Sequence, residues 1–238
     1  MPSLDAEFCD RAVYLPGADA LVCADLHLGR DADSNVELPV GEREDIEGRI
    51  ETLLARFEPD EVVVAGDALH AFDRLPDGVA ASLADLAETI HGAGADLSIA
   101  VGNHDTMLHA AVAEGIDAVS VTDEHRLGGD GAVVLHGHEP PEADAGLYVC
   151  GHVHPAIRIE GQRRPCYLFD EGSDDGADVL VVPAFTRLAA GSLVNRSRRG
   201  GVETPLLGRL GDVRPIVRDD DADETFWFPP LAEFRSML

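Results

Sequence analysis

The chain has 238 residues, and its 45 acidic and 18 basic side chains give a formal net charge of −27 at pH 7. Hydrophobic residues make up 45% of the chain, which excludes the composition of a disordered acidic protein. Apolar runs stay well short of the roughly 18 residues of a membrane-spanning helix, and residues 1–10 lack the basic and apolar regions of a secretory signal. We therefore expect a folded cytoplasmic protein of one large or two small domains, without a membrane partner.

The acidity has two competing explanations: a surface adapted to multimolar intracellular salt, or an acidic patch that recruits a basic partner. All 18 basic residues are arginine, and lysine is absent. In multimolar salt the Debye length shrinks to about 3 Å or less, which screens repulsion among acidic side chains. The acidic residues are spread along the chain, at 31–33, 42–47, 123–124, 170–178 and 219–224. This spread favours the first explanation and predicts a halophilic protein in a high-salt cytoplasm.

Short apolar runs flanked by Gly, Asp or Pro are typical of strands. In chain order they predict strands at Ala12–Leu15, Ala20–Ala24, Val62–Ala65, Leu97–Val101, Ala132–Leu135, Leu147–Cys150, Ala156–Ile159 and Val179–Val182. Three intervening segments place apolar residues on one stripe and predict helices at Glu42–Phe57, Gly78–His91 and Met107–Glu114. The alternation predicts an α/β layered domain, with some antiparallel pairing after about Gly131, where helices become fewer.

The C-terminal region differs in composition from the rest. Residues Arg209–Asp223 are expected to form a loop or tail, because the segment ends in a nearly continuous acidic run. Residues 226–231 then form an apolar aromatic cluster that contains the only tryptophan. We expect this cluster to dock on the same domain; the alternative is a segment that binds a partner.

The four cysteines are far apart and form no C-x-x-C pair: Cys9, Cys23, Cys150 and Cys166. This spacing lacks the pattern of a cysteine metal site, and a large chain without a signal peptide keeps its thiols reduced. We expect all four to be small core residues.

Polar side chains with metal-binding chemistry follow five of the predicted strands directly. They occur as Asp25-Leu26-His27, Gly66-Asp67, Gly102-Asn103-His104-Asp105, His136-Gly137-His138 and Gly151-His152-Val153-His154. In open α/β sheets, ligands bind at the carboxyl ends of the strands. Each motif alone is weak, but five of them at strand ends predict a shared site. The remaining histidines are interpreted as structural: His70, His91, His109 and His125.

The ligand set combines carboxylates, imidazoles and one carboxamide, without a thiolate. Such a set suits Mn²⁺, Fe or Zn²⁺ and not an all-oxygen Ca²⁺ site. It contains more ligands than one ion can use. Two divalent ions about 3.5–4 Å apart that share one carboxylate would fit, and such pairs hydrolyse phosphoesters.

The order and spacing of these motifs resemble the calcineurin-like metallophosphoesterase superfamily over roughly residues 10–195. More narrowly, Ala24–Gly29, Gly66–His70 and Gly151–Pro155 resemble the SbcD-related archaeal phosphoesterases and the ligase-associated bacterial phosphoesterases of DNA repair. The resemblance implies an αββα sandwich, in which helices flank two mixed sheets. It also implies a metallophosphoesterase domain at residues 1–208, with 209–238 as an acidic linker and an aromatic segment that docks on it.

The resemblance further implies a role for each residue of the site. One metal ion would be bound by Asp25, His27 and His154, and the other by Asn103, His136 and His152. Asp67 would bridge the two ions, and a hydroxide between them would attack phosphorus. His104 would be the catalytic residue that is not a ligand, and Asp105 would orient it. His138 could replace His136 as a ligand, and we favour His136 because it follows the strand directly.

The expected activity is a metal-dependent phosphodiesterase, most simply a nuclease that acts on DNA in repair, with Mn²⁺ as the preferred ion and DNA-repair proteins as candidate partners. The alternatives are a small-nucleotide phosphodiesterase or phosphomonoesterase and, more remotely, a non-catalytic scaffold of the same fold. The scaffold predicts missing ligands, whereas every position is filled here. A basic set suits either phosphate contact or a solvated turn: Arg163, Arg164, Arg196, Arg198, Arg199, Arg209 and Arg214. The sequence leaves the oligomeric state open.

Overall fold

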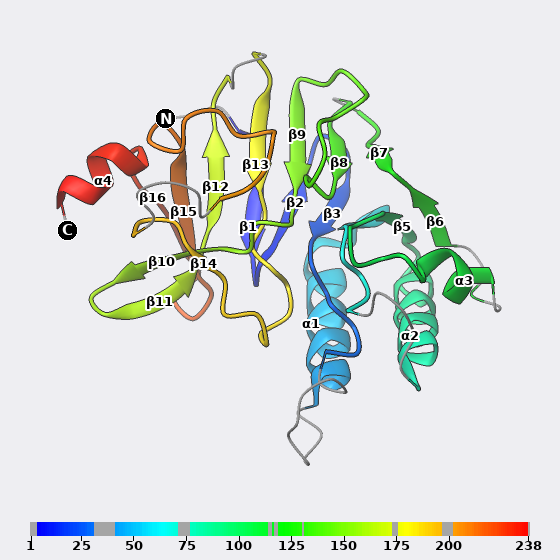
Figure 1. Ribbon diagram of the computed structural model, residues 1–238. Coiled ribbons are helices and arrows are strands. Elements are labelled where there is room, and N and C mark those ends of the chain that lie inside the picture. The colour runs from blue at the N-terminus through cyan, green and yellow to red at the C-terminus, as the bar shows by residue number, and fades with distance from the viewer. Residues whose placement is uncertain are drawn as a thin grey trace.

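The computed structural model describes residues 4–30, 41–70, 77–113, 116, 119–129, 131–172, 176–196 and 202–237. It contains two large sheets and one small one (Figure 1). The first sheet has the strand order β1 (Glu7–Cys9), β2 (Ala12–Leu15), β3 (Ala20–Cys23), β4 (Glu61–Ala65), β5 (Asp96–Ala100) and β6 (Val119–Thr122). The second has the order β16 (Glu224–Trp227), β15 (Arg214–Asp219), β12 (Tyr167–Asp170), β13 (Asp178–Val181), β9 (Leu147–Cys150), β8 (Val133–Leu135) and β7 (Glu124–Arg126).

Both large sheets are mixed, as predicted. In the first, β3, β4, β5 and β6 run parallel, while β1, β2 and β3 are joined by antiparallel pairs. In the second, β13, β9 and β8 run parallel, and the other pairs are antiparallel. The eight predicted strands all form, with ends that differ from the prediction by at most one residue.

The central strands β3 and β4 of the first sheet are buried on both faces because helices cover one face and the second sheet covers the other. Leu21 and Cys23 point towards α1 (Glu42–Phe57) and α2 (Val79–Gly92), whereas Val22 packs into the core between the sheets. This alternation is the period of two that a strand imposes on its side chains. Figure 1 shows α1 and α2 side by side on one flank of the molecule.

The outer face of the second sheet has a thinner cover. The short helix α4 (Leu231–Met237) contributes Leu231 and Phe234 to the core there, and loop residues such as Leu206 fill much of the rest. A three-stranded sheet that we did not predict lies beside it, with the order β11 (Gln162–Pro165), β10 (Pro155–Ile159) and β14 (Ser192–Leu193). One further short helix, α3 (Leu108–Ala113), follows β5. The fold is therefore an α/β sandwich of mixed sheets flanked by helices.

The prediction of a loop at Arg209–Asp223 is wrong in its second half, because β15 crosses it from Arg214 to Asp219. The apolar run of this strand is too short to predict a strand. It has only three buried residues, Pro215, Ile216 and Val217, and charged residues lie on both sides of them. Two neighbouring strands stabilise β15: β12, which is distant in the sequence, and β16, whose sequence has only a weak strand pattern.

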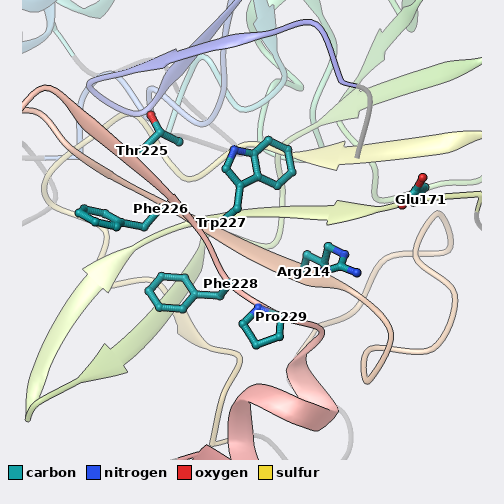
Figure 2. Close-up of a pocket in the computed structure, with 7 residues that line it drawn as sticks. All are labelled: Glu171, Arg214, Thr225, Phe226, Trp227, Phe228 and Pro229. Carbon is teal, nitrogen blue, oxygen red and sulfur yellow. The ribbon is translucent and has the colours of Figure 1, made fainter. Parts of the chain in front are cut away.

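The aromatic segment after β15 packs on the second sheet through β16. Figure 2 shows Phe226 and Trp227 pointing to opposite sides of this strand. The Trp227 ring lies edge-on to Phe8 and to Phe169, with 5.9 Å between ring centroids in each case, whereas Phe226 remains 43% exposed. The segment thus supplies one aromatic residue to the core between the sheets and presents another to solvent.

We expect Phe169→Ala to lower the free energy of unfolding by about 3–5 kcal/mol, because Phe169 is buried between the two sheets and its removal leaves a cavity. Phe226→Ala is the matched control, and its effect should stay within about 0.5 kcal/mol, since that ring is exposed. Denaturant unfolding in concentrated KCl measures both. Equal losses in the two variants would contradict the assignment of the core.

All four cysteines are free and buried, which confirms their interpretation as core residues. In the part of the chain that the structure describes, no helix combines the length and the apolar character needed to cross a membrane.

Candidate metal centre

The five predicted motifs meet at one end of the sandwich, where the carboxyl ends of β3, β4 and β5 face those of β8 and β9. Backbone hydrogen bonds join the loops: Asp25 N–H donates to Gly66 O at 3.0 Å, and Gly151 N–H donates to His136 O at 3.1 Å. Parallel pairing thus sets neighbouring loops beside one another, as expected for the carboxyl edge of a sheet.

Five of the predicted ligands have left-handed backbone conformations. Their φ angles lie between 47° and 66°: Asp25, His27, Asp67, His152 and His154. A residue other than glycine in this region costs about 1–3 kcal/mol, and such residues persist where the surrounding structure holds them. Their concentration in the loops that follow β3, β4 and β9 marks these loops as a strained site.

Two glycines leave room for the carboxylates. A Cβ atom on Gly102 would overlap Asp67 Oδ1, and one on Gly151 would lie 2.7 Å from Asp25 Oδ2. No larger residue fits at either position without displacing a predicted ligand. The glycines of the Gly102-Asn103 and Gly151-His152 motifs are therefore required for the close approach of the loops.

One cluster joins Asp25, His27 and His154. His154 Nε2 lies 3.3 Å from Asp25 Oδ1 and 3.3 Å from His27 Nε2. His27 and Asp25 are almost fully buried, whereas His154 reaches the surface. The three donor atoms lie within 4.8 Å of one another and could hold one cation.

A second cluster centres on His136. Its Nε2 atom lies 2.9 Å from Asn103 Oδ1, 3.1 Å from His152 Nδ1 and 3.5 Å from Asp67 Oδ1. His138 is exposed, and its ring centroid lies 5.1 Å from that of His136. This geometry supports His136 over His138 as the predicted ligand.

The Asp67 carboxylate lies between the clusters. Its Oδ1 atom faces His136 at 3.5 Å, and its Oδ2 atom faces His27 Nε2 at 3.9 Å. Each oxygen therefore points towards a different cluster, which is the arrangement that a bridging carboxylate requires.

The donor atoms have spacings that suit cation binding. Two ligands held about 2.1 Å from one ion at angles of about 90–109° lie about 3.0–3.4 Å apart. The contacts among these ligands range from 2.9 to 3.9 Å, with two buried carboxylates in the set. His27 Nδ1 is buried without a hydrogen-bond partner among the described residues. The residues fit a pair of divalent ions of the imidazole- and carboxylate-binding type.

His104 lies beside Asp67, between the two clusters, and is more exposed than the buried ligands. Its backbone N–H donates to Asp67 Oδ1 at 2.9 Å, and its ring Nε2 lies 3.9 Å from Asp67 Oδ2. The side chain is 24% exposed, so a substrate can reach it. The ring nitrogens of His104, His27 and His70 also lie within 4.8 Å of one another and could hold a cation, so the assignment of His104 as a catalytic residue that is not a ligand stays a prediction.

The Asp105 carboxylate has other partners than the prediction gave it. It accepts hydrogen bonds from the backbone N–H groups of Leu69 at 2.8 Å, Gly102 at 2.9 Å and Ala68 at 3.3 Å. These contacts fix the loop that follows β4 and carries Asp67. Asp105 therefore supports the loop of Asp67, and its predicted role in orienting His104 stays a prediction.

His70 lies at the site although the sequence interpretation left it out. Its ring stacks parallel to that of His104, with 5.9 Å between centroids, and meets the ring of His27 edge-on at 5.4 Å. The sequence feature that could have predicted this is the position of His70, three residues after Asp67 in the same loop. His91, His109 and His125 make no such contact with the clusters in the residues described, and His125 bonds to Glu61 at 2.8 Å.

Comparison with known proteins gives the fold but no family. No protein-family model and no curated protein matches the sequence. Among solved structures, the nuclease MPE of Pseudomonas putida is 23% identical over 87% of this chain and 88% of that chain, with a TM-score of 0.60. The chain has a metallophosphoesterase fold.

Two further solved structures are more distant. The phosphoesterase YfcE from E. coli is 14% identical over 89% of this chain and 98% of its own, with a TM-score of 0.42. A 5′-nucleotidase precursor from Thermus thermophilus is 12% identical over 92% of this chain and 56% of its own, with a TM-score of 0.40. At these TM-scores, neither contributes to the assignment of the fold or the site.

The electrostatics of this metallophosphoesterase fold favour a cation at the clusters. Burial raises the pKa of Asp67 to about 8, and the neighbouring Asp25 carboxylate contributes to the rise. Burial lowers the pKa of His27 to about 3 and that of His136 to about 4. These two imidazoles are therefore neutral at pH 7 and available as ligands, and burial without a nearby cation holds the Asp67 carboxyl in its neutral form.

The raised pKa of Asp67 predicts how the metal-free protein responds to pH. Its folded pKa of about 8 exceeds the ordinary value of 3.8, so the folded chain retains a proton that the unfolded chain has lost. The contribution of the Asp67 carboxyl to the free energy of unfolding is therefore greatest at low pH and falls as the pH rises towards 8. With chelator present, Asp67→Asn should therefore gain stability over the wild type between pH 5 and 8, measured by thermal unfolding; a pH-independent difference would contradict this.

The arginines that could contact phosphate do not gather at the metal centre in the part of the chain that the structure describes. Arg198 and Arg199 lie outside the described residues. Arg163 donates to Ala190 O at 3.0 Å, and Arg164 pairs with Asp219 at 3.4 Å. Arg214 lines the hollow beside Phe226, so it serves the C-terminal segment instead of the metal centre (Figure 2).

Proposed function

We propose that the protein is a metal-dependent phosphodiesterase that binds two divalent ions, with Mn²⁺ preferred. One ion would be held by Asp25, His27 and His154, and the other by Asn103, His136 and His152. The observation that carries the proposal is the Asp67 carboxylate, whose two oxygens face different clusters. The ions would polarise the phosphoryl group and lower the pKa of the attacking water.

The chain's own residues would then bind and orient the phosphodiester. His104, exposed at the rim of the site, would donate a proton to the leaving oxygen or a hydrogen bond to the phosphoryl group. Asn103 would keep the second cluster less negative than a carboxylate would, which favours an anionic substrate. Asp105 would hold the loop of Asp67 through its backbone contacts.

We propose nucleic acid as the substrate, within the SbcD-related and ligase-associated group and thus in DNA repair. The motif resemblance supports this choice, as does the likeness in fold to a protein described as a nuclease. Mn²⁺-supplemented assays in concentrated KCl against single-stranded DNA, duplex DNA, cyclic nucleotides and phosphomonoesters would test it. Cleavage of DNA is expected, whereas activity confined to monoesters would overturn the nuclease proposal.

A cavity beside His136 favours a second candidate, a small-nucleotide phosphodiesterase. The cavity has a volume of about 450 Å³, enough for a nucleoside, and also contacts Gly102 and His138. Its wall includes four carboxylates, which repel further phosphate groups: Asp123, Glu124, Glu139 and Glu142. In the same assays, a preference for cyclic nucleotides over DNA would select this candidate.

We also propose that the protein works in a high-salt cytoplasm. The net charge of −27 and the absence of lysine support this proposal. We expect the chain to lose its fold and activity in dilute KCl and to regain both in multimolar KCl, because salt screens the repulsion among surface carboxylates. Circular dichroism across a KCl titration measures the effect; full folding and activity in dilute salt would contradict the proposal.

A further inference from the structure

Arg49 is a buried cation that lies outside the two clusters. It points inward from α1 and is only 7% exposed. Its Nε donates to Asp10 Oδ2 at 2.6 Å, its Nη2 donates to Asp10 O at 2.9 Å, and its guanidinium lies 3.8 Å from the centroid of the Phe185 ring. Burying a charge is costly, and a well-packed apolar residue often stabilises such a position equally well. The contacts of Arg49 therefore point to a positioning role.

Arg49 and Arg11 together hold three consecutive carbonyl groups in the loop after β13. Arg49 Nη1 donates to Phe185 O at 2.7 Å. Arg11 Nη1 donates to Thr186 O at 2.6 Å and to Ala184 O at 3.2 Å. Asp10 and Arg11 form the two-residue turn of the hairpin between β1 and β2, and both have left-handed backbone conformations. This turn places Arg11 beside the loop and Asp10 beside Arg49.

The same loop is bonded to the backbone of a proposed metal ligand. Phe185 N–H donates to Ala24 O at 2.8 Å, and Thr186 N–H donates to Asp25 O at 3.4 Å. Asp25 has a φ of 55°, a conformation that needs support from its surroundings. A continuous path of hydrogen bonds thus runs from Arg49 through Phe185 to the strand end that carries Asp25.

We propose that Arg49 is a positioning residue for the ion held by Asp25, His27 and His154, acting with Arg11 through residues 184–186. The inference rests on the proposed metal-binding function. Metal ligands lose affinity when the groups that orient them are removed, typically by 10–100-fold. The second cluster, centred on His136, receives no hydrogen bond from this loop among the described residues. It is joined to Asp25 only through the side-chain carboxylate, which accepts a hydrogen bond from His152 N–H at 3.1 Å and lies 3.8 Å from His136 Nδ1, so its ion should be affected less.

The test is a Mn²⁺ titration in concentrated KCl by calorimetry and electron paramagnetic resonance, with folding checked by circular dichroism. The variants are Arg49→Met, which removes the donors, and Arg49→Lys, which restores the charge and one donor. Arg43→Met is the matched control, because Arg43 lies on the same helix, is half-exposed and pairs only with Glu47 and Asp85 among the described residues. Arg11→Met replaces Arg49→Met if the latter fails to fold.

We expect the wild type and Arg43→Met to bind two ions with a coupled dimanganese spectrum. Folded Arg49→Met should bind one ion about 10-fold or more weakly and show a mononuclear spectrum at limiting metal, and Arg49→Lys should recover part of the loss. Two equally tight ions in folded Arg49→Met, or equal weakening of both, would overturn the positioning role alone. A wild type that binds no Mn²⁺ would overturn the proposed function, and the inference with it.

Discussion

His104→Ala is expected to keep both metal ions and to lose about 10²–10⁴-fold in the rate of phosphodiester hydrolysis. The ring borders the clusters at 3.9 Å from Asp67 Oδ2, while the hydrogen bond to Asp67 comes from the backbone of His104 and survives the substitution. Metal content should therefore be unchanged, and the loss should fall on kcat. A nitrophenyl phosphodiester and bound-metal analysis measure the two quantities on one preparation.

His109→Ala is the control for this experiment. His109 is exposed on α3 and belongs to neither cluster. Its activity should remain close to that of the wild type. Unchanged turnover in His104→Ala would refute the role of His104, and a variant that also loses its metal would reassign His104 as a ligand.

Asp67→Asn is expected to bind fewer metal ions, with a fall from two towards one or none. The substitution preserves shape and retains an oxygen that can accept the His104 N–H, but it removes the charge that two cations would share. A ligand that binds the folded state, present at 100 times its Kd, stabilises that state by about 2.7 kcal/mol. Added Mn²⁺ should therefore raise the unfolding temperature of the wild type clearly and that of Asp67→Asn only slightly.

The two effects of this substitution have opposite signs. Without metal, Asp67→Asn should be the more stable protein at neutral pH, because burial raises the pKa of the native carboxyl to about 8. With metal, the wild type should be the more stable. Two tightly bound ions in Asp67→Asn would contradict the bridging assignment, while the metal-free comparison would still report on the burial of Asp67.

The strands and helices were predictable where burial on both faces leaves a continuous apolar run. The run at Val62–Ala65 and the stripe of Ile46, Ile50 and Leu53 are examples, and α1 begins and ends as predicted. Strand β15 was not predictable, because charged residues surround its short core and one of its two pairing partners, β12, is distant in the sequence. The small sheet was missed for a similar reason, since β11 is exposed along its length.

The gathering of the motifs was predictable because parallel strands direct their carboxyl ends to one edge. The partners of Asp105 were not, since they are backbone N–H groups, which carry no sequence signal. Arg49 had a signal, because it falls on the apolar stripe of α1 three residues after Ile46. Its contact with Phe185 depends on tertiary structure and could not be anticipated.

The most direct test of a binuclear phosphodiesterase is the anomalous scattering of crystals grown in concentrated KCl with Mn²⁺. We expect two manganese peaks about 3.5–4 Å apart, with Asp67 between them. Asp25, His27 and His154 should surround one peak, and Asn103, His136 and His152 the other. A single peak, or manganese bound away from Asp67, would contradict the assignment.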